Sequence, residues 1–418
     1  MEFLIQSFIG DGITWELWLK YLAMWAIGGV LIFLAIKKEM EPALLLPMGL
    51  GCILVNIPWS NVLNEVSIVE VYICECGHEM NGLLEKCTSC GVPLVLEQNL
   101  LLVEKEVVET AGVIDWLFKV GIHASEAMPI LLFIGIGAMI DFGPLLTNPK
   151  LFILGGAAQF GIFLTITLAV LCGFNINDAA SIGIIGAADG PTSILVALKL
   201  GSSLIGPIMV VAYSYMALVP IIQPAVIKCT TTKKERAIKM HYSPKQVSKL
   251  TRILFPIIVT IIAGVIAPSS LALIGFLMFG NLIRECGVLG TMKDTASNGL
   301  ANLITLLLGI TIASQLRAET FISWDTLMII GLGLLAFIFD TVAGIMTAKA
   351  MNLFSKEKIN PMIGAAGISA FPMAARTVQT MAVKENPSNH LLMHAIGANV
   401  SGQVASAIVG GLILGILM

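Results

Sequence analysis

The chain consists of long apolar runs separated by short polar connections, and most of the runs are long enough to cross a membrane. A helix needs about 20 mainly apolar residues to span the hydrocarbon core of a bilayer. The pattern gives ten or eleven such segments, which predicts an all-α polytopic membrane protein. The segments are Leu17–Ile36, Ala43–Trp59, Ala127–Leu146, Leu151–Cys172, Ala179–Leu200, Ser203–Ile227, Ile253–Leu282 (two short pieces around Pro268), Gly299–Leu316, Leu327–Ala350, Pro361–Val383 and Leu391–Met418.

Glycine and proline interrupt two of these segments, Ala179–Leu200 and Pro361–Val383. In the first segment the break follows Asp189, and in the second it precedes and includes Pro372. A break frees backbone carbonyl groups, which can then ligate a cation inside a membrane protein. The two breaks therefore predict a cation site within the membrane.

The breaks also occupy matching places in the two halves of the chain. Pro191 and Pro372 are 181 residues apart, and so are Gly183 and Gly364. Paired interrupted segments are typical of transporters built from inverted repeats, which bind their substrate at the midplane. Coincidence is the alternative, because glycine and proline are frequent in ordinary transmembrane helices. We expect two inverted repeats with paired broken helices.

Each interrupted segment carries a charge within its apolar run, Asp189 in the first and Arg376 in the second. A charge in hydrocarbon is unfavourable and usually faces a cavity, where it marks an ion or proton path. Arg376 always keeps its proton, so it needs an anion, either Asp189 or the carboxylate of a substrate. The alternative is an arginine whose head group reaches the membrane interface.

Neutral oxygens in or beside neighbouring segments complete the candidate site: Tyr215, Asn360, Ser369 and Asn399. One carboxylate with carbonyl and hydroxyl oxygens suits a hard cation such as Na+ better than a metal that prefers thiolate or imidazole.

Composition and charge restrict the protein class further. The chain is 57% hydrophobic and 12% charged, with a mean hydropathy of +0.91, whereas soluble domains carry about 25% charged residues. The sequence has no basic stripe with interleaved aromatic residues, so it gives no sign of a nucleic-acid partner. Lys228–Arg252 has eight basic residues and one acidic residue, Glu235, so the positive-inside rule places it in the cytoplasm. We expect no removable signal peptide, because the N-terminus lacks a basic region and a small-residue cleavage site.

A polar insert over residues 61–125 holds four clustered cysteines. Four thiolates suit one structural, tetrahedral Zn²⁺ ion, for which His78 is a substitute ligand; two disulfides are the alternative. If Ala179–Leu200 crosses the membrane, the insert is cytoplasmic and zinc is favoured. If that segment re-enters, the insert lies outside. The cysteines are Cys74, Cys76, Cys87 and Cys90.

Three further carboxylates lie in or beside apolar runs. We interpret Asp141 as capping the turn before Gly143, although it could line the ion path. Asp178 is expected to cap the interrupted helix. Asp340 lies inside an apolar run and could be another ion ligand or could pair with a neighbouring span.

Several longer blocks carry a family resemblance: residues 133–146 (FIGIGAMIDFGPLL), 183–192 (GIIGAADGPT), 212–220 (AYSYMALVP), 358–376 and 391–395 (LLMHA). With these blocks the chain resembles the β subunit of the sodium-translocating, biotin-dependent decarboxylases. That family includes the oxaloacetate, methylmalonyl-CoA, glutaconyl-CoA and malonate enzymes. The resemblance extends over nearly the whole chain.

The resemblance implies a function. A partner subunit supplies carboxybiotin, and the membrane subunit decarboxylates it, consumes a proton and moves Na+ outward. It implies catalytic roles for Asp189, Arg376 and Ser369. The Na+ site that it implies consists of Asp189, Asn360, Gly364, Ser369 and Tyr215.

The resemblance also implies the partners: a carboxyltransferase α subunit, a biotin carrier protein, a small membrane subunit and further copies of the same chain in a homo-oligomer. It implies a multi-pass protein of the inner (cytoplasmic) membrane. The expected division of the chain is N-terminal transmembrane helices (1–60), the cysteine insert (61–125), a first repeat (126–227), the basic loop (228–252) and a second repeat (253–418).

Two other functions stay open from the residues alone. A secondary transporter for a carboxylate, or for Na+/H+ exchange, would also need paired broken helices and Arg376. A membrane scaffold that docks a partner through a zinc module is the other, although a scaffold has no use for a buried Asp189.

Overall fold

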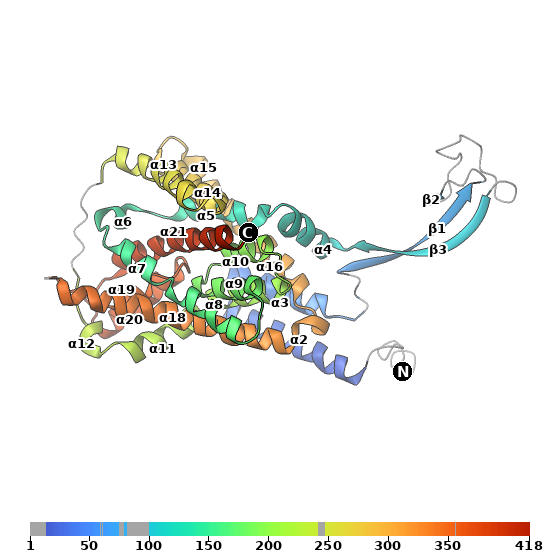
Figure 1. Cartoon of the computed structure of the whole chain (residues 1–418), viewed down its shortest axis with the longest axis horizontal. Coiled ribbons are helices and arrows are strands. Elements are labelled where there is room, and N and C mark those ends of the chain that lie inside the picture. The colour runs from blue at the N-terminus through green and yellow to red at the C-terminus, as the bar shows by residue number, and fades with distance from the viewer. Residues whose placement is uncertain are drawn as a thin grey trace.

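The computed structural model describes residues 14–58, 60, 62–74, 79–81, 100–240, 247–355 and 357–418. These residues form an elongated helical bundle with a small sheet that projects from one end (Figure 1). The helices are α2 (Trp15–Lys37), α3 (Pro42–Val55), α4 (Val113–Phe118), α5 (Ala127–Met139), α6 (Gly143–Thr147), α7 (Leu151–Ala157), α8 (Phe160–Leu171), α9 (Ile176–Gly183), α10 (Gly190–Lys199), α11 (Ile205–Thr230), α12 (Lys233–Arg236), α13 (Lys249–Ile266), α14 (Leu271–Glu285), α15 (Gly290–Asp294), α16 (Ala301–Ile312), α17 (Ala318–Phe321), α18 (Trp324–Phe354), α19 (Met362–Ala365), α20 (Met373–Glu385) and α21 (Leu392–Leu417).

Seven helical segments of the described chain are long and apolar enough to cross a membrane. A bent pair, Val113–Ala124 with Ala127–Met139, makes an eighth if it is counted as one span; its two parts meet at 74°. The polytopic all-α class is thus confirmed, with fewer full spans than the ten or eleven segments of the hydropathy pattern. The difference arises because Pro42–Val55 is short and because both interrupted segments are broken.

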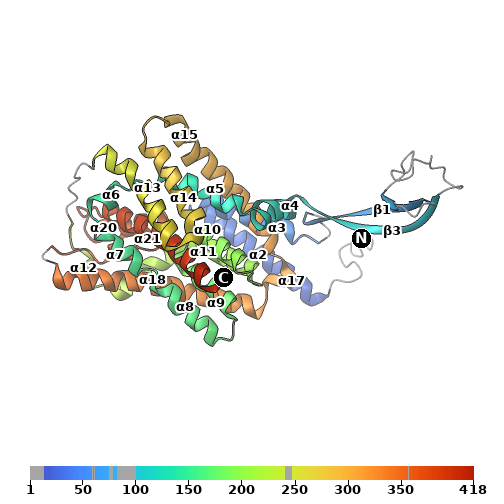
Figure 2. The ribbon, with the colours of Figure 1, turned by 45° about the horizontal axis from the view of Figure 1, so that its top comes forward.

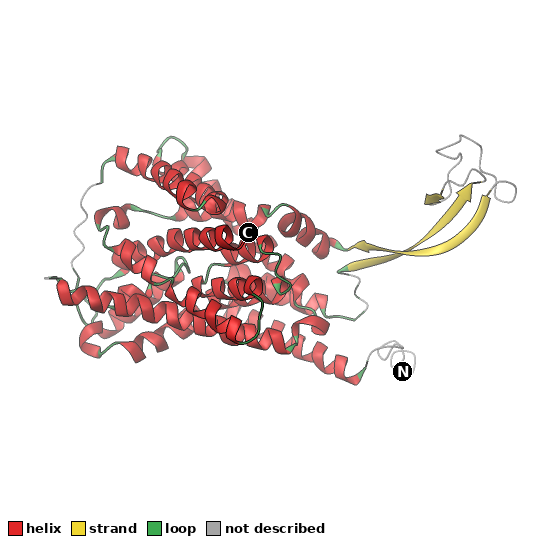
Figure 3. Cartoon of the chain, viewed as in Figure 1, coloured by secondary structure: helices red, strands yellow, loops and turns green. Residues whose placement is uncertain are grey.

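The insert contains strands, which the sequence analysis did not predict (Figure 3). Strands β1 (Asn64–Cys74), β2 (Glu79–Asn81) and β3 (Leu100–Ala111) form an antiparallel sheet in the order β2-β1-β3. Asn64 pairs with Ala111, and Cys74 pairs with Leu100. In both views the sheet projects from the end of the bundle that lies opposite α12 (Figure 2).

The first interrupted segment, α9 and α10, is a re-entrant hairpin. The side-chain amide of Asn177, in α9, donates to the carbonyl of Leu200, just after α10, at 3.1 Å. The Asp178 carboxylate accepts from the Ser202 hydroxyl at 2.5 Å and from the Ser203 amide at 3.1 Å. The two ends of the segment are therefore tied together at one mouth, and the segment does not cross.

The second interrupted segment, α19 and α20, is re-entrant as well. Asn360, just before α19, donates from its side-chain amide to the Arg236 carbonyl at 2.8 Å. Glu385, the last residue of α20, accepts from the Arg236 guanidinium at 2.8 Å. Arg236 thus holds both ends of this hairpin beside α12.

The two hairpins enter the bundle from opposite ends and meet inside it. Helix α11 connects the two mouths, and its 26 residues extend over about 39 Å. At the tips the Ser369 amide donates to the carbonyl of Ala187 at 3.0 Å. The paired broken helices of the sequence analysis are thus present; a repeat relationship between the two halves stays a prediction.

Helix α21 passes beside both tips and belongs to the main apolar core. Small residues allow this close approach: a Cβ on Gly402 would overlap the backbone of Gly367 in the second hairpin. Close packing through small residues is a common means of helix association in membranes. A second core joins α2, α3 and α16 on another side of the bundle.

Candidate functional site at the hairpin tips

Asp189 lies at the break of the first hairpin, directly after Ala188, whose φ of +52° turns the chain. Its side chain is 3% exposed. One carboxylate oxygen, Oδ2, accepts from the Thr192 hydroxyl at 2.5 Å and from the Gln403 amide at 3.1 Å, with the Ser406 hydroxyl at 3.5 Å. All three donors are neutral. Among the described residues, no cationic side chain forms an ion pair with Asp189.

The second hairpin contributes Ser369, which is 2% exposed. Its amide bonds to Ala187, two residues before Asp189, and its hydroxyl donates to the Gly402 carbonyl of α21 at 3.0 Å. Beside it, the Asn399 amide donates to the Ile368 carbonyl at 2.6 Å, while the Asn399 Oδ1 atom is buried and accepts no hydrogen bond from the described residues. The tips and α21 therefore gather one carboxylate and several neutral oxygens.

Three residues of this cluster were not singled out from the sequence: Thr192, Gln403 and Ser406. Thr192 follows Asp189 by three residues, in the first turn of α10, which places it under the carboxylate. Gln403 and Ser406 lie on α21, with Asn399 one turn earlier. Their spacing of three and four residues puts them on one helix face, and this was a usable sequence signal.

Three of the predicted site residues form contacts with groups other than Asp189. The Tyr215 hydroxyl donates to the Ile330 carbonyl of α18. Asn360 is at the mouth of the second hairpin, where its Oδ1 accepts from the Met362 amide at 3.0 Å. Gly364 packs against Gly344 of α18. Their roles as Na+ ligands stay predictions.

Arg376 forms no ion pair with Asp189; it lies exposed in the first turn of α20. Its positive charge acts on Glu41, in the turn between α2 and α3. Burial raises the pKa of Glu41, and the positive charge of Arg376 opposes that rise. Among the described residues, Arg376 forms no ion pair.

Asp141 accepts from the Gly143 amide at 2.8 Å, which confirms the turn cap. Asn175, not Asp178, is the N-cap residue of α9; it accepts from the Asp178 amide at 2.8 Å, and Asp178 instead ties the hairpin mouth. Cys76, Cys87 and Cys90 lie outside the described residues, as does the side chain of Cys74. Within the part of the chain that is described, no cluster of three His, Cys, Asp or Glu residues could hold a metal ion.

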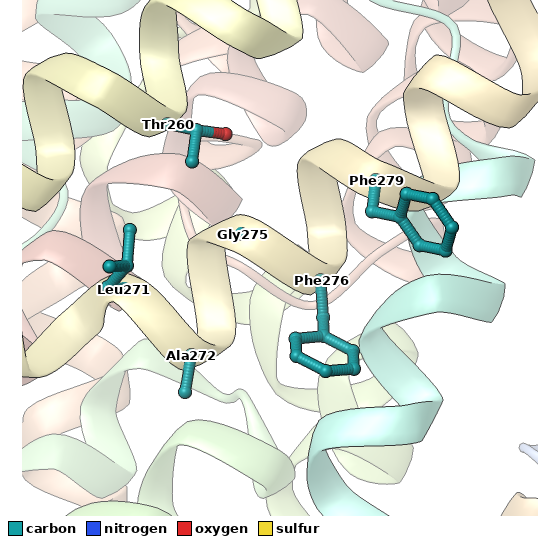
Figure 4. Close-up of a pocket in the computed structure, with 6 residues that line it drawn as sticks. All are labelled: Thr260, Leu271, Ala272, Gly275, Phe276 and Phe279. Carbon is teal, nitrogen blue, oxygen red and sulfur yellow. The ribbon is translucent and has the colours of Figure 1, made fainter.

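Two pockets lie away from the tips. Figure 4 shows one of about 600 Å³ on α13 and α14, whose lining is apolar apart from the Thr260 hydroxyl. None of the candidate site residues lines it, so we do not assign it to the site. A polar pocket of about 280 Å³ lies at the mouth of the first hairpin, lined in part by Asn175, Asp178 and Ser203.

A substitution at Gly364 can distinguish a role in helix packing from a role as a Na+ ligand. A Cβ there would overlap the Gly344 backbone, which cannot step aside. We expect Gly364→Ala to lower the melting temperature, since overpacking destabilises by about 1–3 kcal/mol. Gly331→Ala, at a position with no atom within 4 Å of the added Cβ, is the matched control and should be neutral. An unchanged melting temperature together with weaker Na+ affinity would instead support a ligand role for Gly364.

Comparisons with known proteins identify the family. Residues 20–417 match the family described as "Na+-transporting oxaloacetate decarboxylase beta subunit". The chain is 46% identical over 394 residues to the methylmalonyl-CoA decarboxylase subunit beta of Propionigenium modestum, with 94% of each chain covered. It is 42% identical over 410 residues to the probable oxaloacetate decarboxylase beta chain of Vibrio cholerae, again with 94% of each covered. It is also 42% identical over 413 residues to the methylmalonyl-CoA decarboxylase subunit beta of Veillonella parvula, covering 99% of this chain and 97% of that one.

With a match over nearly its whole length and with relatives of this similarity, the chain belongs to the family of β subunits of the Na+-transporting decarboxylases.

Proposed function

We propose that this subunit decarboxylates carboxybiotin and uses the reaction to move Na+ outward, with Asp189 as the carboxylate that carries Na+ or a proton. The observation that carries the proposal is the meeting of two re-entrant hairpins from opposite ends beside a buried carboxylate. Such a junction can be approached from either end of the bundle while the ligand stays in one place.

The groups around Asp189 suit Na+ as a transported substrate. Na+ is a hard cation that prefers oxygen ligands. The Thr192 hydroxyl donates its hydrogen to the carboxylate, whereas the Ser406 hydroxyl donates to the Gln403 carbonyl at 3.1 Å and lies 3.5 Å from the carboxylate. A hydroxyl also offers two lone pairs and can rotate. The bare Oδ1 atom of Asn399 adds an oxygen near the second tip. Rotation of these groups would exchange donors for ligands without moving the backbone.

Protons and Na+ then compete for the same oxygens. When carboxybiotin loses its carboxyl group, the N–C bond breaks, CO₂ leaves and the ring nitrogen takes up one proton. A proton released from Asp189 when Na+ binds there can supply this demand. This competition couples the binding of one Na+ ion at Asp189 to the consumption of one proton by decarboxylation.

Arg376 is the residue that we expect to meet carboxybiotin. Its planar fork can hold a carboxylate through two parallel hydrogen bonds. It is exposed, carries no ion pair in the described chain and lies four residues after Pro372, which ends the second tip. Ser369 connects the two functions, because it touches Ala187 of the first tip and belongs to the segment that leads to Arg376.

The basic loop sets the proposed orientation. With Lys228–Arg252 in the cytoplasm, the second hairpin opens inward, and the first hairpin and the sheet face the other side. Na+ would leave through the polar pocket at the mouth of the first hairpin, beside Asp178. We further propose insertion in the inner membrane, a carboxyltransferase α subunit, a biotin carrier protein and a small membrane subunit as partners, and a homo-oligomeric assembly.

This orientation bears on the cysteines of the insert. With this orientation and a re-entrant first hairpin, the insert would lie outside, where thiols are oxidised, and the reason for preferring zinc would no longer apply. We therefore expect two disulfides among Cys74, Cys76, Cys87 and Cys90, with zinc as the alternative. Mass spectrometry without reductant and elemental analysis distinguish them: about one zinc per chain, lost in a Cys87→Ser, Cys90→Ser variant, would restore the zinc site.

A secondary carboxylate or Na+/H+ transporter is the alternative function. The isolated chain, supplied with free carboxybiotin, decides between them. We expect CO₂ release that depends on Na+. Na+/H+ exchange without any decarboxylation under these conditions would favour the transporter.

A further inference from the structure

Exposed lysines surround the mouth of the second hairpin, and the proposed mechanism does not use them. The mouth is formed by α12, α19 and α20, which lie together at the end of the bundle opposite the sheet (Figure 1). Hydrogen bonds join these segments: the Asn360 amide donates to the Ile238 carbonyl at 2.9 Å, and so does the Asn389 amide at 2.9 Å. The lysines are Lys233, Lys234, Lys239, Lys358 and Lys384. We call these five residues the basic rim.

Two carboxylates of this mouth are already paired with other cations. Glu385 accepts from the Arg236 guanidinium at 2.8 Å, and Glu235 lies 3.0 Å from the Lys349 ammonium. By contrast, no lysine of the basic rim forms an ion pair with a described residue. The exposed carboxylate of Glu357, beside the rim, can balance at most one of them. The basic rim therefore presents a surplus of positive charge to solvent.

The exposed face of α20 leads from the basic rim to Arg376. Arg376, Thr380 and Lys384 are all exposed, and their spacing of four residues puts them on one face of the helix. The residues between them are buried or half-buried. Charged and hydroxyl groups on this face suit contact with water rather than with lipid tails. The distance along the helix from Lys384 to Arg376 is about 12 Å, which a biotin at the end of a lysine side chain can bridge.

We propose that the basic rim is the docking surface for the biotin carrier protein, and that it recognises an acidic surface around the biotinyl lysine of that carrier. This inference rests on the proposed function, because it takes the carrier as the source of carboxybiotin. Complementary charges would steer the carrier onto the mouth of the second hairpin. Its biotin would then extend along the exposed face of α20 toward Arg376. Because the rim contacts the carrier and not the reacting group, it would affect the encounter and not the decarboxylation step.

The test compares two substrates of the purified full-length subunit at fixed Na+: free carboxybiotin and the carboxylated biotin carrier protein. In the double variant Lys233→Glu, Lys234→Glu we expect the KM for the carboxylated carrier to rise about tenfold with kcat unchanged, because charges at the edge of an interface act mainly on association. The KM for free carboxybiotin should change little. Lys293→Glu is the matched control, since this exposed lysine is on α15, apart from α12 in both views (Figures 1 and 2).

Ionic strength gives a second readout that needs no variant. Added KCl screens exposed charges while Na+ stays constant. The KM of the wild-type subunit for the carboxylated carrier should therefore rise with KCl, more steeply than the KM for free carboxybiotin. In the double variant this dependence should be weaker.

An unchanged KM for the carboxylated carrier in the double variant would refute the docking surface and leave these lysines as determinants of membrane orientation only. The proposed function would stand in that case, because the subunit would still decarboxylate carboxybiotin. An equal rise in KM for both substrates would also overturn the proposal, since the lysines would then act on the subunit or on any anion. If the wild-type subunit decarboxylates neither substrate, the proposed function fails instead.

Discussion

We expect Asp189→Asn to abolish Na+ transport and Na+-dependent decarboxylation, while the protein still inserts and folds. Asparagine has the same shape and still accepts from Thr192 and Gln403 through its oxygen. It lacks the charge that compensates a buried Na+ ion. Losing the charged partner of a buried ion costs about 3–5 kcal/mol, which is more than about a hundredfold in affinity.

The measurement is the rate of carboxybiotin decarboxylation against Na+ concentration, with the melting temperature as the check on folding. Asp294→Asn, an exposed acidic residue on α15, provides the control and should keep full activity. Sodium-dependent turnover near the wild-type rate in a well-folded Asp189→Asn protein would show that the carboxylate at the break does not carry the ion.

Arg376→Lys is expected to lose turnover that no Na+ concentration restores. Lysine keeps the positive charge but lacks the planar fork that binds a carboxylate bidentately, so the substrate is no longer oriented. Because Arg376 makes no ion pair with Asp189, this loss should leave Na+ binding in place. Equilibrium Na+ binding and decarboxylation, measured on the same preparation, check both halves of the expectation.

Ser369→Ala is the informative comparison for Arg376→Lys. It removes a neutral oxygen and the hydrogen bond to Gly402, which typically costs about 1–2 kcal/mol, or roughly tenfold in affinity. High Na+ should rescue it in part. If Na+ rescues Arg376→Lys and not Ser369→Ala, the two roles have been exchanged.

The apolar spans and the two breaks could be predicted from the sequence because both are local properties. Hydropathy averaged over about 20 residues indicates a membrane-spanning segment, and the residues around Asp189 and Pro372 indicate a break in the helix. Whether the first interrupted segment crosses the membrane or re-enters is not a local property of the sequence. It depends on the contacts of Asn177 with Leu200 and of Asp178 with Ser202 and Ser203, more than 20 residues away.

The composition of the site was predictable only in part, for the same reason. Asp189 and Ser369 come together as the motifs suggest, yet Gln403 reaches Asp189 from 214 residues away. Asn360 and Gly364 lie in the same motif as Ser369, but the structure uses them to tie and to pack the hairpin. The motif therefore did not show which of its residues lie at the tip, and which of them bind Na+ stays a prediction.

The sheet of the insert was not predicted, because the interpretation of this segment rested on its cysteines. Residues 66–73 read Val-Ser-Ile-Val-Glu-Val-Tyr-Ile, a run rich in β-branched residues, which favour strands. That signal was available, and it would have predicted β1. The cysteine spacing alone gave no information on strand pairing.

Coupling between decarboxylation and Na+ movement is the central claim, and one measurement on the intact complex in sealed proteoliposomes tests it most directly. With the decarboxylase substrate supplied to outward-facing catalytic subunits, CO₂ release and uptake of radioactive Na+ are followed together. The account predicts that Na+ accumulates in step with CO₂, and that Asp189→Asn stops both. Continued CO₂ release without Na+ uptake in wild type, or undiminished Na+ uptake in Asp189→Asn, would contradict it.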